Sequence, residues 1–92
     1  MLAGAAAAAP TPARYAGQKL APLARISLQR ARATALSARP GVITSQELEK
    51  ERGGSGLRYS FDVIGGGRTY EVGVDARSGA VLENDREGKN AD

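Results

Sequence analysis

The most restrictive feature of this sequence is a pair of alternating segments joined by a glycine-rich turn. In residues 57–63 (LRYSFDV) and 70–75 (YEVGVD), large apolar side chains occupy every second position, and polar or small residues stand between them. A period of two is typical of a β-strand with one buried face. The intervening Gly65-Gly66-Gly67-Arg68 is short, so we predict that the two strands form an antiparallel hairpin.

Further strands are expected on both sides of this hairpin. Residues 42–51 form a first strand that places Val42, Thr44, Gln46 and Leu48 on one face, and the glycine-rich residues 52–56 turn the chain. After residue 75, Asp-Ala-Arg-Ser-Gly reads as a tight turn, because Asp hydrogen-bonds the backbone two residues on and Gly79 tolerates a positive φ. Val81 and Leu82 then return as a short last strand, so the sheet is an antiparallel meander of three to four strands.

Matching the apolar faces across the hairpins predicts the register. The expected opposite pairs are Leu48 with Tyr59, Phe61 with Val72, Glu49 with Arg58, and Asp62 with Glu71. The outer face of the sheet would then be polar and water-exposed, carrying Glu47, Glu49, Asp62, Glu71 and Asp75 against Arg58. The inner face would hold the aromatic side chains Tyr59, Phe61 and Tyr70.

A helix is predicted ahead of the sheet, in residues 24–39. Small apolar residues recur there at spacings of three and four, from Ala24 through Leu28 to Ala38, which draws a narrow stripe on one helix face. Ser27 suits the N-cap, and Pro40-Gly41 ends the helix. The predicted fold class is therefore α+β, with one N-terminal helix packed on a three- to four-stranded antiparallel meander. We divide the chain into a flexible leader (1–23), a folded domain (24–83) and a disordered polar tail (84–92).

Charge and composition exclude several classes of protein. Residues 1–41 carry six basic and no acidic side chains, whereas residues 42–92 carry seven basic and ten acidic ones, a net of −3. The positive charges are scattered, so we expect no nucleic-acid partner. The chain contains no histidine and no cysteine, and no two carboxylates flank a predicted cleft. We therefore expect no enzyme activity, no catalytic residue, no cofactor and no metal site.

The opening MLAGAAAAAPTPA resembles the end of a signal peptide, because it is alanine-rich and offers small-residue cleavage sites. It lacks a basic stretch before the apolar residues, so a low-complexity flexible N-terminus is the alternative interpretation. No apolar run is long enough to span a bilayer. We expect a periplasmic or secreted protein without membrane insertion, present as a monomer or weak dimer.

Three stretches together resemble the PepSY family: ISLQRARATALSARPG, LEKERGGSGLRYSFDV and RTYEVGVDARSGAVL, roughly residues 26–82. The most specific part is the last, with Tyr70, Val72, Val74 and Asp75-Ala76 followed by Gly79, Val81 and Leu82. The resemblance implies a helix on a small antiparallel sheet, export from the cytoplasm, and a role like that of peptidase propeptides, which restrain a protease. No peptidase is attached here, so restraint would act on a separate protein.

The remaining candidate site is the edge of the sheet. An exposed edge strand can accept an extended peptide as an additional strand. If strand order follows sequence, residues 42–51 form one edge, and Glu47, Glu49 and Glu51 are its candidate partner-binding residues. Charged residues also protect edges from such pairing, so both interpretations stay open. The leading hypothesis is a non-catalytic module that binds a protein or peptide and modulates or inhibits a secreted or envelope peptidase. The alternative is an extracytoplasmic domain that senses a ligand or signal without a protease target.

Overall fold

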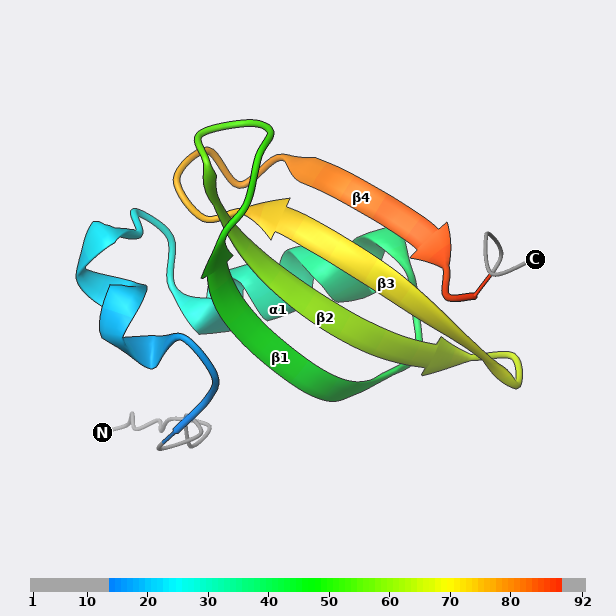
Figure 1. Cartoon of the computed structure of the whole chain (residues 1–92). Coiled ribbons are helices and arrows are strands. Elements are labelled where there is room, and N and C mark those ends of the chain that lie inside the picture. The colour runs from blue at the N-terminus through cyan, green and yellow to red at the C-terminus, as the bar shows by residue number, and fades with distance from the viewer. Residues whose placement is uncertain (1–13, 89–92) are drawn as a thin grey trace, which may run out of the picture.

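The computed structural model describes residues 14–88 of the 92-residue chain. The elements are a short 3₁₀ helix η2 (Gln18–Leu23), an α-helix α1 (Leu28–Ala38) and four strands: β1 (Val42–Lys50), β2 (Leu57–Gly65), β3 (Arg68–Asp75) and β4 (Val81–Arg86). Figure 1 shows α1 lying across one face of the sheet, with β1 and β4 at the two edges. The fold is α+β with the helix before the sheet, as predicted.

The four strands form one antiparallel sheet in the order β1-β2-β3-β4. All four predicted cross-strand pairs are confirmed, among them Leu48 with Tyr59 and Phe61 with Val72. The pairing Asp62 with Glu71 places two acids opposite each other on the outer face. The register follows because shifting a strand by one residue would carry its whole apolar face into water.

The first residues of β1 differ from the prediction. A register shift between Ile43 and Ser45 inserts an extra residue, so the side-chain alternation changes there. Ile43 packs against the core, whereas Val42 is 66% exposed and Thr44 is also exposed. The prediction that Val42 and Thr44 share the inner face with Leu48 is therefore wrong, while Gln46 does lie on the helix side and accepts a hydrogen bond from Arg32.

The core lies between α1 and the inner face of the sheet. The Ser27 side chain accepts a hydrogen bond from the Arg30 backbone N–H, which confirms it as the N-cap. From α1, Leu28, Ala31 and Ala35 are buried against the sheet. The small alanine side chains let the helix axis approach the strands closely. The ring centroids of Tyr59 and Phe61 lie 6.4 Å apart on the facing side of β2.

The turn between β3 and β4 holds several segments together through Asp75 and Ala76. The Asp75 carboxylate accepts from the backbone N–H groups of Arg77 and Ser78 at 2.8 and 2.9 Å, so the predicted Asp turn is confirmed. It also accepts from the backbone N–H and hydroxyl of Ser55, at 2.6 and 2.9 Å. Asp75 pairs with Arg58 and so lies on the outer side of the sheet, as predicted, but it is 1% exposed, so the prediction that it faces water is wrong.

Ala76 ties this turn to the approach of the helix. Its backbone carbonyl accepts from the N–H groups of both Arg25 and Ile26, at 2.9 and 3.1 Å. Its own N–H donates to the Leu57 carbonyl at 2.8 Å. The segment that leads into α1 is thereby fastened to the sheet beside β2.

The two ends of the described chain are more ordered than we expected. Residues 14–23 contain η2 and bring Tyr15, Leu20 and Ala21 against the core, and residues 1–13 of the predicted leader lie outside the described residues. Strand β4 continues to Arg86, past the predicted boundary at residue 83, and the Glu87 N–H donates to the Thr69 carbonyl. Residues 89–92 also lie outside the described part. The division of the chain at residues 24 and 83 as domain boundaries stays a prediction.

Candidate functional site

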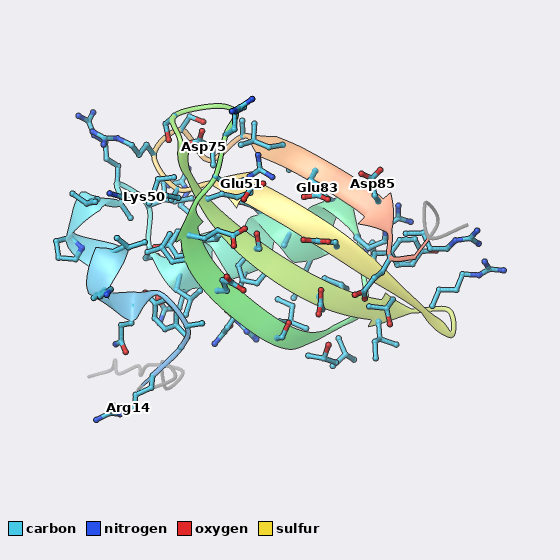
Figure 2. All side chains as sticks on the ribbon, in the orientation of Figure 1. Arg14, Lys50, Glu51, Asp75, Glu83 and Asp85 are labelled. Carbon is cyan, nitrogen blue, oxygen red and sulfur yellow. The ribbon has the colours of Figure 1, made fainter. Side chains whose placement is uncertain are left out.

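The three candidate residues of the first strand do not share one environment. Glu47 is exposed, Glu49 is half-buried and accepts a hydrogen bond from the Ser60 hydroxyl at 2.8 Å, and Glu51 lies one residue beyond the end of β1. Figure 2 shows Lys50 and Glu51 beside the loop that leads into β2. β1 is an edge strand of the sheet, as predicted. The role of Glu47, Glu49 and Glu51 in partner binding stays a prediction.

The edge of β1 is partly covered by the chain itself. Ala16 forms an isolated parallel bridge with Glu47, and its carbonyl accepts a hydrogen bond from the Leu48 N–H at 2.9 Å. We call residues 14–17 the N-terminal strap. Because backbone groups two residues apart on a strand point the same way, those of Gln46 and Lys50 face the same edge as those of Leu48. The strap therefore covers the middle of a row of backbone donors and acceptors.

The outer face of the sheet is strongly acidic. Six carboxylates lie on this face, and Figure 2 shows two of them, Glu83 and Asp85, on β4. The six are Glu47, Glu49, Asp62, Glu71, Glu83 and Asp85. Arg58 crosses this face and pairs with Glu83 at 3.3 Å. In residues 14–88, no group of three or more acidic side chains is arranged to hold a metal ion.

Two carboxylates of this face have raised pKa values. The pKa of Glu47 is raised, chiefly by the neighbouring Glu49 and then by its own burial, Glu71 and Asp62. The pKa of Glu71 is raised first by burial and then by the charges of Glu83 and Asp62. The outer face therefore attracts cations, because its carboxylates repel one another and have one positive side chain among them.

A surface cavity of about 380 Å³ lies between η2 and the beginning of α1. Its lining is mixed apolar and polar and includes Tyr15, Gln18, Arg25, Ile26, Leu28 and Tyr59. The Tyr59 hydroxyl donates to the Ile26 carbonyl at 2.9 Å, and burial raises the pKa of this phenol. Sequence reasoning missed the cavity, because one wall is the segment that we expected to be a flexible leader.

This architecture defines a small α+β domain with an edge strand and an acidic sheet face. The sequence matches the PepSY family, described as "Peptidase propeptide and YPEB domain", over residues 25–85. The chain therefore belongs to the PepSY family, as its resemblance implied. Neither the curated proteins nor the solved structures compared with it include a match.

The residues that carry the most specific part of the family resemblance have structural roles in this fold. Asp75 and Ala76 hold the β3–β4 turn, and Gly79 has a φ of 82°, which favours glycine. PepSY domains are generally non-catalytic propeptide or inhibitor-like modules, and they typically occur in extracytoplasmic proteins. Among residues 14–88, no helix has the length and apolar character needed to cross a bilayer.

Proposed function

We propose that this chain is a non-catalytic binding module that modulates or inhibits a secreted or envelope peptidase through the edge of β1. Membership of a propeptide-like family over residues 25–85 is the observation that carries the proposal. A peptidase binds its substrate as an extended chain, and an edge strand offers the same backbone groups as such a substrate. We further propose that the protein acts in the periplasm or outside the cell.

The acidic residues give this edge a preference among partners. Glu47 and Glu49 lie on β1, Glu51 follows it, and the outer face beside them is acidic. Complementary charge raises association rates and disfavours acidic partners. We therefore expect a peptidase whose groove is rimmed by basic side chains.

The proposal is tested by mixing the purified protein with a panel of secreted and envelope metallopeptidases and measuring peptide hydrolysis. We expect a concentration-dependent loss of activity with at least one enzyme of the panel. Glu47→Lys and Glu49→Lys, each made alone, should weaken inhibition, whereas the charge-matched Glu87→Lys, outside β1, should not. Unchanged hydrolysis across the whole panel, at protein concentrations up to about 100 μM, contradicts the proposal.

The cavity favours a second candidate function, the sensing of an extracytoplasmic ligand without a protease target. Its volume of about 380 Å³ is within the range of small-molecule sites, and it combines an apolar lining with Arg25 and Gln18. A thermal-shift screen against small carboxylates and short peptides separates the two functions. A ligand that raises the melting temperature of the wild type, but not that of Ala21→Trp, which adds a large side chain to the half-buried cavity wall, favours sensing.

A further inference from the structure

The N-terminal strap shows what kind of backbone the edge of β1 accepts. The strap runs parallel to β1 at Glu47 and takes the hydrogen bond of the Leu48 N–H at 2.9 Å. A partner that added a strand at this edge would need the same Leu48 N–H. The strap and such a partner strand therefore cannot be bound at the same time.

The strap position after Ala16 requires glycine on two independent grounds. Gly17 has a φ of 81°, which side chains other than glycine rarely adopt. A Cβ atom placed on Gly17 would lie 1.7 Å from the Leu48 carbonyl oxygen and 2.8 Å from its carbon. Because both atoms belong to the backbone of β1, neither can move aside without disturbing the strand.

The residue before Ala16 anchors the strap by its side chain. Tyr15 is half-buried, packs against the core and lines the cavity beside Tyr59. The segment around it carries two positive charges, Arg14 in the strap and Lys19 in η2, and no acid. The order of residues along the strap and the first turn of η2 is thus basic, aromatic, small, glycine and, two residues later, basic.

We propose that the edge of β1 is an acceptor for a partner segment with this pattern, which runs parallel to β1 through its aromatic and small residues and turns away from the edge at its glycine. The strap occupies the acceptor until such a segment displaces it. This inference rests on the proposed function in one respect, the use of the β1 edge for partner binding. Displacement is feasible because the strap pairs with β1 through one bridge, and such short pairings open at a small fraction of the global unfolding free energy.

The experiment uses the full chain and a synthetic peptide of residues 14–23, RYAGQKLAPL, with a fluorophore on its N-terminus. In Gly17→Ala the strap cannot sit on Leu48, so its acceptor is open. The matched control is Gly88→Ala, because Gly88 has a φ of 82° and no atom within 4 Å of the added Cβ. By fluorescence anisotropy, we expect Gly17→Ala to bind the peptide at least about tenfold more tightly than the wild type or Gly88→Ala, since the bound strap reduces the fraction of open acceptor.

Two further measurements serve as controls for the peptide-binding result. The same peptide carrying the Gly17→Ala change should not bind any of the three proteins. Amide hydrogen exchange of Leu48 should be faster in Gly17→Ala than in Gly88→Ala, while the central Val72 amide exchanges equally slowly in both. If Gly17→Ala does not fold, hydrogen exchange in the wild type tests the inference. The opening that exposes the Leu48 amide must then have a lower free energy than the opening that exposes the Val72 amide.

Equal peptide binding by all folded variants would overturn the inference, and so would an equally protected Leu48 amide. These outcomes are separable from the peptidase test. If the peptide binds but no peptidase is inhibited, the proposed function is contradicted and the acceptor at the β1 edge is supported. If a peptidase is inhibited but the peptide does not bind, the partner uses another sequence pattern or another surface.

Discussion

Replacing Asp75 with Asn tests the account of the β3–β4 turn most directly. The Asp75 Oδ1 accepts three hydrogen bonds, from the Ser55 hydroxyl and from the N–H groups of Arg77 and Ser78, and Oδ2 accepts one from the Ser55 N–H. The amide oxygen of an Asn can still accept the three hydrogen bonds made to Oδ1. Its NH₂ group, however, takes the place of Oδ2 and cannot accept from the Ser55 N–H, because both groups are donors. The charge that strengthens all four bonds is also lost.

The expected cost follows from these contacts. A hydrogen bond to a charged group contributes about 1.5–3 kcal/mol, and a donor left unsatisfied adds its own desolvation cost. We expect Asp75→Asn to lower the free energy of unfolding by about 2–4 kcal/mol, out of roughly 5–15 kcal/mol for a domain of this size. That loss corresponds to a fall in melting temperature of about 10–25 °C. Urea denaturation followed by circular dichroism measures it, with the exposed Asp85→Asn as the control.

The pH dependence supplies an independent check. Desolvation alone would raise the pKa of Asp75, but the hydrogen bonds from Ser55, Ser78 and Arg77 outweigh it and hold the pKa well below its usual range. A group with a lowered folded-state pKa stabilises the fold above its unfolded pKa of about 3.9, and this contribution is lost as the pH falls further. The wild type and Asp75→Asn should therefore differ most at neutral pH and converge below about pH 4. A difference from Asp85→Asn smaller than about 0.5 kcal/mol, or a gap that does not narrow in acid, would refute the reasoning.

Three other substitutions probe the core and the acidic face. Ala35→Leu should destabilise the fold by about 1–3 kcal/mol in thermal unfolding, because Ala35 is fully buried under the sheet, whereas the exposed Ala33→Leu should be neutral. Tyr59→Phe should lower the free energy of unfolding by about 1 kcal/mol, because the hydrogen bond to the Ile26 carbonyl is lost. The wild type should lose stability above about pH 10, because the raised phenol pKa favours the neutral form in the fold, and Tyr59→Phe should not show this loss. Glu71→Gln should stabilise by about 0.5 kcal/mol at pH 7 in urea denaturation, since burial and neighbouring acids disfavour its charge; the gain should shrink as the pH falls through the raised pKa and be gone below its ordinary value of 4.5, where the wild-type carboxyl is protonated in both states. An unchanged stability in the first two, or a gain for Glu71→Gln that persists in acid, contradicts the corresponding argument.

The strand pattern was predictable because it depends on local order. Alternation in residues 57–63 and 70–75, short glycine turns and one register that buries both apolar faces leave few other arrangements. The bulge near Thr44 was not predictable in this way. Val42 and Ile43 are both β-branched and apolar, so the sequence does not show which of them faces the helix.

The features that define the candidate site depend on contacts between distant residues. Alternation alone assigns Asp75 to the outer face, and only its approach to Ser55, twenty residues earlier, explains its burial. The strap has no periodicity, and its place on β1 follows from tertiary contacts of Tyr15 and Gly17. The glycine and the flanking positive charges were visible in the sequence, but their target was not.

The order β1-β2-β3-β4 has a consequence for how the chain reaches its folded state. Each strand pairs with the one that precedes it in the chain, so a polypeptide emerging N-terminus first from a narrow channel can add one hairpin at a time. No strand has to wait for a partner still inside the channel, and such local pairings are the fastest kind to form. The carboxylate partner of the loop around Ser55 arrives at the end of β3, and the last hairpin then adds the N–H groups of Arg77 and Ser78 to the same carboxylate.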